Sequence, residues 1–101
     1  MEQPWFRQGP SLAVSWEALF TRRALKDLPK LEAARLDGTV QDLVELLKRD
    51  PFHTPPPFKK LRGELSGSYS RRINRTHRLV YDLDAERRQV YIRSIWSHYG
   101  E

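Results

Sequence analysis

The chain contains no cysteine among its 101 residues. Disulfide bonds and thiolate metal sites are therefore excluded, and the composition suits a reducing cytoplasm. The three histidines, His53, His77 and His98, lie far apart in the sequence and show no metal-ligand spacing such as an i, i+4 pair. We therefore expect no metal ion and no other cofactor.

Long apolar runs are also missing. No segment approaches the length that spans a membrane, and the start, Met1-Glu2-Gln3-Pro4, lacks the basic-then-apolar layout of a secretory signal. A chain of 101 residues and 12.0 kDa is large enough to bury one core but too small for two. We expect a flexible leader over residues 1–12 and a single cytoplasmic domain over residues 13–101, without membrane association.

The net charge of +5 is concentrated in one segment. Residues 1–50 carry eight basic and eight acidic side chains, whereas residues 51–101 carry ten and five. Glu64 is the single acid between Lys59 and Arg78, a stretch that holds seven basic residues: Lys59, Lys60, Arg62, Arg71, Arg72, Arg75 and Arg78. A solvated surface mixes the two signs more often, so this segment indicates a binding surface for a polyanion.

The apolar spacing of the first half predicts a strand and two helices. Apolar residues alternate strictly from Leu12 to Phe20, which is typical of a half-buried strand. Thr21 is predicted to cap a short helix that ends at Pro29. Apolar residues then recur at helical spacing from Leu36 to Leu47, which predicts a second helix stopped by Pro51.

The second half predicts three strands. A proline-rich connector over residues 53–57 leads to strand-like runs over 68–74, 77–83 and 89–97, whose short connections favour an antiparallel meander. The predicted fold is α+β: an N-terminal strand, two helices on one face of the sheet, and a three-stranded meander that completes the sheet. The other face of the sheet is left free for a ligand.

Strand periodicity brings two arginines to this free face. Successive side chains of a strand point to opposite faces, so Arg72 and Arg71 lie on different faces of the predicted sheet. For the same reason Arg78 lies on the other face from Leu79 and Tyr81. If these apolar residues meet the helices, Arg78 points outward, close to Arg72 across a tight turn. Two guanidinium groups on one face form a bidentate clamp for phosphate.

The end of the chain supplies candidate catalytic groups. Strict alternation in the last strand places Val90, Ile92, Trp96 and His98 on one side and Tyr91, Arg93 and Ile95 on the other. His98 and Tyr99 can then approach the arginine clamp. The alternative is that Trp96 and Tyr99 hold the chain end against the core while His98 has no function of its own.

Metal-free RNA cleavage requires three contributions. A base deprotonates the 2′-hydroxyl, cations neutralise the charge that builds on the phosphorane, and an acid protonates the departing 5′-oxygen. The arginines suit the second need and His98 the third, while Tyr99 can stack on a nucleobase. Glu64 is the one carboxylate in the basic segment, and it is either the base or an ordinary loop residue.

Several segments together resemble the Txe/YoeB branch of the RelE-like bacterial toxins. They are WEALFT (16–21), ALKDL (24–28), DPF (50–52), PPP (55–57), LRGELSG (61–67), YSRRIN (69–74), HRLVY (77–81) and the terminal His98-Tyr99. The resemblance implies a RelE-like fold of the microbial-RNase type and a metal-independent, ribosome-dependent endoribonuclease that cuts mRNA in the A site of the 70S ribosome. It also implies silencing by a Phd/YefM-type antitoxin, in an assembly that is either a homodimer or a toxin-antitoxin hetero-oligomer able to bind operator DNA.

Carried over by position, Arg78 resembles the catalytic arginine of the family and Arg72 a phosphate-binding one. His98 and Tyr99 resemble the terminal catalytic pair. Arg62 stands where some members have lysine. Together with Lys59, Lys60 and Arg71, the residues Arg62 and Arg72 are the predicted RNA-binding cations.

One position departs from the family pattern. Lys59 stands where the family usually has a glutamate proposed as the general base, and a protonated lysine cannot take that role. Either Glu64 substitutes, the ribosome or another group supplies the base, or the activity is reduced. The same departure leaves open a second function, that of a ribosome or RNA binder that blocks translation without cutting. A basic domain that only pairs with a protein partner is the third alternative.

Overall fold

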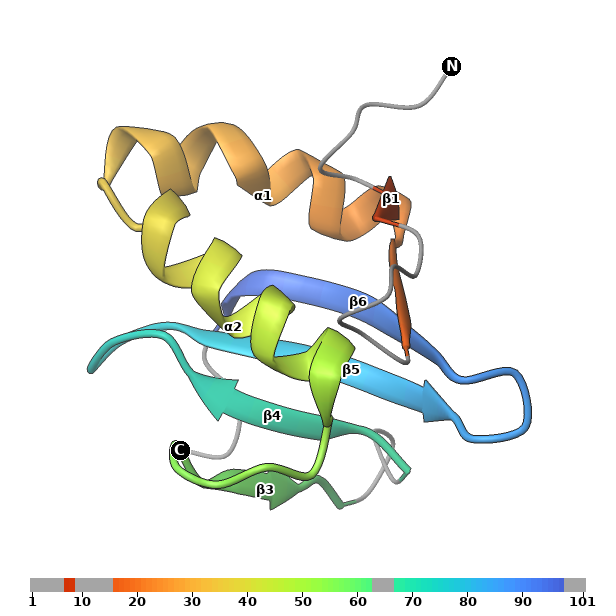
Figure 1. The fold of residues 1–101 in the computed structure, drawn as a ribbon. Coiled ribbons are helices and arrows are strands. Elements are labelled where there is room, and N and C mark those ends of the chain that lie inside the picture. Colours follow the sequence, from red (N-terminus) through yellow and green to blue (C-terminus); the bar gives the residue numbers. More distant parts are fainter. Residues whose placement is uncertain (1–6, 9–15, 63–66, 98–101) are drawn as a thin grey trace.

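A computed structural model describes residues 7–8, 16–62 and 67–97 of the chain (Figure 1). The described elements form a six-stranded sheet in the order β1-β2-β6-β5-β4-β3, accompanied by two helices. Their bounds are β1 (Arg7–Gln8), β2 (Glu17–Phe20), α1 (Arg22–Ala33), α2 (Asp37–Arg49), β3 (Phe58–Lys60), β4 (Tyr69–Arg72), β5 (Arg78–Asp84) and β6 (Gln89–Ser97).

The predicted α+β class and the meander are confirmed. Strands β4, β5 and β6 are consecutive antiparallel neighbours, and β2 joins the sheet by pairing in parallel with β6. Of the predicted first strand, residues 17–20 are found as β2, while residues 12–15 lie outside the described part. Strands β1 and β3 have only two and three residues, too few for an alternation pattern to reveal them.

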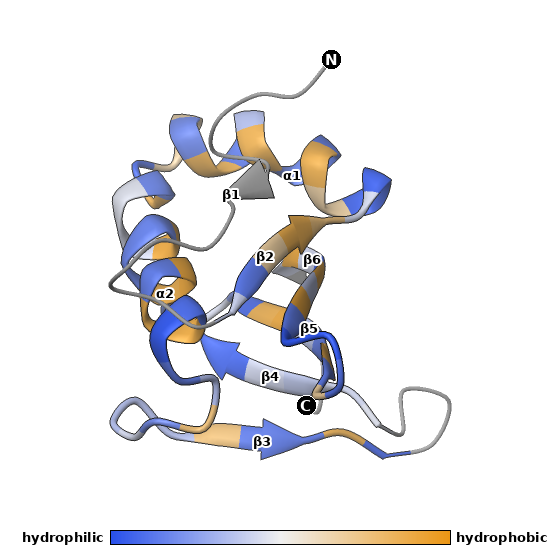
Figure 2. Ribbon diagram, turned by 45° about the vertical axis from the view of Figure 1, so that its right-hand side comes forward, coloured by the Kyte–Doolittle hydropathy of each residue, from blue (hydrophilic) through white to orange (hydrophobic). Residues whose placement is uncertain are grey.

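Both helices cover the same face of the sheet. Buried side chains of α1 and α2 form one core with residues from β2, β5 and β6, including Ala18, Leu79, Tyr81, Val90 and Ile92. Figure 2 shows hydrophobic and hydrophilic residues alternating along both helices, which is typical of helices with one face on a core. The opposite face of the sheet, called here the helix-free face, carries the side chains that alternate with this core set.

Helix α1 does not end at Pro29, contrary to the prediction. The helix continues through this exposed proline to Ala33. Proline inside a helix costs about 3 kcal/mol because it removes one backbone donor. Burial of Leu28 and Leu31 against the core offsets this cost, since a leucine side chain contributes about 1.5–3 kcal/mol when fully buried.

The true end of α1 is a left-handed turn at Arg35. This residue has a φ of 61°, and the N–H of Leu36 donates to the carbonyl of Leu31 at 2.8 Å. Glycine is the usual residue at this position, because a Cβ atom is strained at positive φ. The sequence holds an arginine there, so no glycine signal marked the boundary.

Replacing Arg35 by glycine is expected to stabilise the protein. The left-handed conformation costs an L-residue about 1–2 kcal/mol, and glycine avoids this cost. Part of the gain is lost because glycine also makes the unfolded chain more flexible. We expect Arg35→Gly to raise the free energy of unfolding by about 0.5–1 kcal/mol in urea titrations. Ala34→Gly is the matched control, and it should lower stability because Ala34 has a φ of −89°. Equal effects of the two substitutions would contradict this account.

Candidate functional site

Arg72 and Arg78 are direct cross-strand neighbours at the end of the β4–β5 hairpin. Their Cα atoms are paired in the antiparallel register, and paired residues project from the same face of a sheet. That face is the helix-free one, because Leu79, the next residue after Arg78, lies in the core. The prediction that the two arginines lie side by side on this face is confirmed.

The guanidinium group of Arg78 is oriented by Ser70. Its Nη1 atom donates to Ser70 Oγ at 3.4 Å, and Ser70 is fully buried two residues before Arg72 on the same face. Arg78 is half-buried, while Arg72 is exposed. Sequence reasoning missed Ser70, although the alternation that assigns Arg72 to this face assigns Ser70 to it as well.

Lys59 shares the face of the two arginines. It is paired with Ser70 across the β3–β4 ladder, so its side chain starts next to the hydroxyl that holds Arg78. Among the described residues, no carboxylate forms an ion pair with Lys59, Arg72 or Arg78. Three cations on adjacent strands, without an acid between them, form a site that attracts a polyanion.

The other predicted RNA-binding residues do not all join this site. Lys60 is paired with Tyr69, which places it on the opposite side of the sheet from Lys59. Arg62 is exposed beyond the end of β3. Glu64, His98 and Tyr99 lie outside the described residues, so their predicted roles stay predictions.

Arg71 is a structural residue, and the prediction that it binds RNA is wrong. It is 0% exposed. Its Nε atom donates to the hydroxyl of Tyr81 at 3.1 Å, and its two terminal nitrogens donate to the carbonyls of Pro56 at 2.5 Å and Pro51 at 2.9 Å. Its guanidinium also lies 5.1 Å from the ring centroid of Phe58. Strand alternation explains the difference, since Arg71 points toward the core while Arg72 points away from it.

An aromatic cluster packs around Arg71 and supports β3. Phe52, Phe58 and Tyr69 contact one another edge to face, with ring centroids 5.7–6.1 Å apart, and Tyr69 stacks on Tyr81. Burial raises the pKa of Tyr81 above its ordinary value, while the hydrogen bond from Arg71 acts in the opposite direction. The cluster attaches the 51–58 segment to the sheet, and this segment leads directly to Lys59.

Neighbouring arginines are therefore expected to respond differently to substitution. Arg71→Leu removes the donor from the buried carbonyl of Pro51 and from the partly buried carbonyl of Pro56, and an unsatisfied buried group costs about 1–3 kcal/mol. We expect a loss of about 3 kcal/mol or more in the free energy of unfolding, measured by urea denaturation. Arg72→Leu, the control on the exposed side, should change stability by less than about 0.5 kcal/mol. Similar losses in both variants would rule out the structural role of Arg71.

The last strand ends beside Arg78. Arg78 is paired with Ser97, the last residue of β6, and His98 is the next residue in the sequence. The indole of Trp96 stacks on the imidazole of His77, with centroids 3.7 Å apart and planes inclined by 22°. Trp96 also packs against the core, so it holds the end of β6 in place, as the structural alternative for Trp96 had predicted.

The strict alternation predicted for this strand is wrong at Ile95. The register shifts twice between β5 and β6, and Ile95 is fully buried in the core with Val90 and Ile92 rather than facing away with Arg93. A β-bulge inserts an extra residue and reverses the side that the following residues face. Sequence alternation alone does not reveal such an insertion.

No group of three or more histidine or acidic side chains in the described part of the chain could hold a metal ion. No described helix is long and apolar enough to cross a membrane.

Comparisons with known proteins agree with this fold. Residues 20–99 match the family model described as the YoeB-like toxin of bacterial type II toxin-antitoxin systems. The sequence is similar to toxin YoeB of Streptomyces coelicolor, with 48% identity over 42 residues, which are 42% of this chain and 50% of that protein. The alignment thus spans half the length of this curated relative.

Solved structures of toxins share the architecture over most of the chain. A YoeB/ParE toxin from Agrobacterium tumefaciens superimposes with a TM-score of 0.73 and 27% identity, covering 81% of this chain and 98% of that one. The toxin of a YoeB-YefM complex from Staphylococcus aureus gives a TM-score of 0.70 and 28% identity, covering 84% and 99%.

Proposed function

Because this chain belongs to the family of YoeB-like toxins of bacterial type II toxin-antitoxin systems, we propose that it is a ribosome-dependent endoribonuclease that cuts mRNA in the A site. One observation carries the proposal. Arg72 and Arg78 are paired on the helix-free face, and Lys59 lies on the next strand of the same face. Adjacent guanidinium groups match the oxygen geometry of phosphate, and no carboxylate among the described residues neutralises them.

The proposed reaction is an attack of the 2′-oxygen on the neighbouring phosphorus. A new P–O2′ bond forms while the P–O5′ bond breaks, which leaves a 2′,3′-cyclic phosphate and a free 5′-hydroxyl. Arg78 donates hydrogen bonds to the phosphorane as its charge builds, and Arg72 binds a phosphate oxygen. His98 gives its proton to the departing 5′-oxygen, and Tyr99 stacks on a base of the mRNA.

The reaction also needs a base that takes the proton of the 2′-hydroxyl. Lys59 carries a positive charge in its usual form, so it binds phosphate together with Arg62 on the approach to the site. Glu64 lies in the same basic segment of the sequence and is the candidate base of this chain. A group of the ribosome is the alternative source.

The proposed partners follow from the family and from the charge of this surface. The mRNA is the substrate, and the 70S ribosome in the bacterial cytoplasm is the partner on which it is cut. A Phd/YefM-type antitoxin covers the cationic face with acidic and apolar side chains, so the antitoxin and RNA compete for it. A solved relative is described as a YoeB-YefM complex, which supports this type of partner. The toxin is proposed to act as a homodimer or within a hetero-oligomer that binds operator DNA.

Mapping of mRNA 5′ ends after induction of the protein tests the proposed cleavage directly. New ends at codons that occupy the A site are expected if the protein cuts mRNA. Lys59 at the position of the family glutamate favours a second candidate, a binder that arrests translation without cutting. Growth arrest without new 5′ ends would replace the nuclease by this second function.

Neutralising Arg78 is expected to abolish cleavage without unfolding the protein. Arg78→Ala removes the donor nearest the proposed phosphorane, and loss of such a donor typically lowers a rate by about two to three orders of magnitude. Thermal melting should stay within a few degrees of wild type, because the side chain of Arg78 makes one long hydrogen bond within the described part of the chain. Arg87→Ala, in the exposed β5–β6 turn, is the control of equal charge and should cut like wild type. Undiminished growth arrest by Arg78→Ala would remove this residue from the mechanism.

Single-turnover cleavage on programmed ribosomes should separate the proton-transfer groups. His98→Ala is expected to slow the chemical step by roughly two to four orders of magnitude with nearly unchanged ribosome affinity. Glu64→Gln should cause a comparable loss if Glu64 is the base. Lys59→Glu, which introduces the family residue, should leave the rate unchanged or raise it. Full activity of Glu64→Gln would assign the base to another group, and full activity of His98→Ala would exclude His98 as the acid.

A further inference from the structure

Strand β6 contains two extra residues opposite the start of β5. Four residues of β5, Arg78 to Tyr81, are matched by six residues of β6, Ile92 to Ser97, through two register shifts. Each bulge leaves backbone groups of the longer strand without partners in the ladder, and such groups must be satisfied elsewhere when they are buried.

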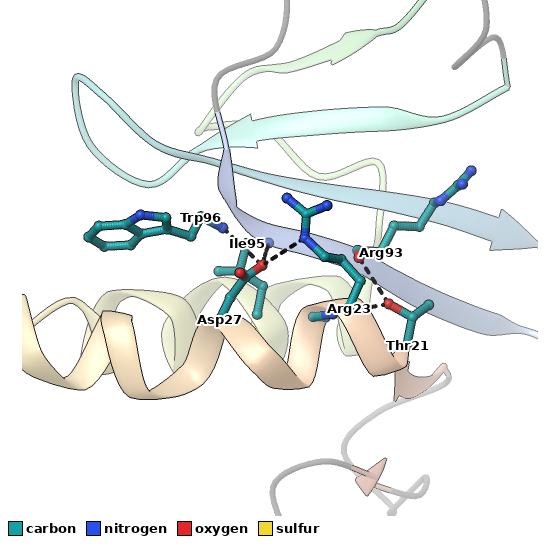
Figure 3. Close-up of polar contacts among 7 residues, drawn as sticks. Thr21, Arg23, Asp27, Arg93, Ile95 and Trp96 are labelled. Carbon is teal, nitrogen blue, oxygen red and sulfur yellow. Dashed lines mark hydrogen bonds and ion pairs between the residues drawn. The ribbon is translucent and has the colours of Figure 1, made fainter.

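Helix α1 supplies the missing partners (Figure 3). One oxygen of Asp27, Oδ2, accepts hydrogen bonds from the N–H groups of Ile95 at 3.0 Å and Trp96 at 3.3 Å. At the start of the helix, the hydroxyl of Thr21 donates to the carbonyl of Arg93 at 2.9 Å while accepting from the N–H of Ala24. The two side chains therefore meet both irregular positions of β6.

The carboxylate of Asp27 is unusually placed for a helix residue. It is 2% exposed and occupies the core-facing stripe of α1 with Ala24, Leu28 and Leu31. Among the described residues it forms one ion pair, with the Nε atom of Arg23 at 3.9 Å, on a side chain that is 60% exposed. A buried charge is costly to desolvate, so the contact with β6 must compensate for it.

The consequence of the bulges appears at Arg78. Without the two extra residues, the regular register of β5 and β6 would place Ile95 opposite Arg78; with them, Ser97 takes that position. The shift of two residues moves the chain by about 7 Å along the strand. The bulges therefore place Ser97, the last residue of β6, next to the arginine site, and His98 follows it in the sequence.

We propose that Asp27 is a positioning residue: by accepting the N–H groups of Ile95 and Trp96, it holds the bulged register of β6 that places Ser97 opposite Arg78. This inference rests on the proposed RNA cleavage for its kinetic part, while the register itself can be measured without cleavage. Asp27 does not touch the RNA and acts through the backbone of β6.

The experiment compares Asp27→Leu, which removes the acceptor, with Asp27→Asn, which keeps an oxygen acceptor and removes the charge. Val40→Ala, in the core of α2, is the control for general destabilisation. Thr21→Val and Thr21→Ser form a second pair, because serine retains the hydroxyl and valine does not. Amide hydrogen exchange at Ile95 and Trp96 is measured by NMR, and single-turnover cleavage and ribosome affinity are measured where each variant is folded.

We expect Asp27→Leu to accelerate exchange at both amides by about tenfold or more and to slow cleavage by about a hundredfold, with ribosome affinity within about twofold of wild type. Asp27→Asn should restore exchange and rate to within about threefold, and Val40→Ala should cleave at the wild-type rate. Thr21→Val should cleave mRNA more slowly than Thr21→Ser. This comparison keeps the proposal testable if Asp27→Leu does not fold.

Unchanged exchange in Asp27→Leu, or a rate equal to that of Val40→Ala, would overturn the positioning role. Asp27→Asn as slow as Asp27→Leu would overturn it too, because the charge rather than the acceptor would then matter. If wild-type protein cuts no mRNA on ribosomes, the proposed function fails by itself. The exchange data then still decide whether Asp27 holds the register.

Discussion

The hydrogen bonds between Asp27 and the bulge of β6 are the interaction on which the rest of this structure depends most. They connect the helix layer to the central part of the sheet, and they do so at the strand end that meets Arg78. A buried acceptor aimed at two backbone donors is directional, whereas apolar packing is not. The core residues of α1 stabilise its contact with the sheet, and Asp27 together with Thr21 holds the bulged register of β6.

The arginine pair Arg71-Arg72 shows how the sheet separates stability from binding. The two residues are adjacent in the sequence, yet one is fully buried and the other is exposed. Arg71 donates hydrogen bonds to the loop that leads to β3, while Arg72 is exposed next to Arg78. The buried arginine thus supports the cationic surface from beneath without contributing to it.

In the described part of the chain, no carboxylate forms an ion pair with the three cations of the helix-free face. Lys59, Arg72 and Arg78 start from three neighbouring strands, and their mutual repulsion is relieved when an anion binds. Such a surface suits the proposed function, in which RNA and an antitoxin bind the same charges and therefore exclude each other.

Sequence periodicity determined the α+β class, the Thr21 cap, the meander and the outward direction of Arg72 and Arg78, because each follows from spacing within one element. It also marked Asp27 as unusual, because this residue is a single acid among the apolar residues of one helix face. The length of α1, the bulges of β6 and the burial of Arg71 were decided by the tertiary structure. Each depends on partners distant in sequence: core packing overrides Pro29, α1 stabilises the bulges, and the carbonyls of Pro51 and Pro56 bind Arg71.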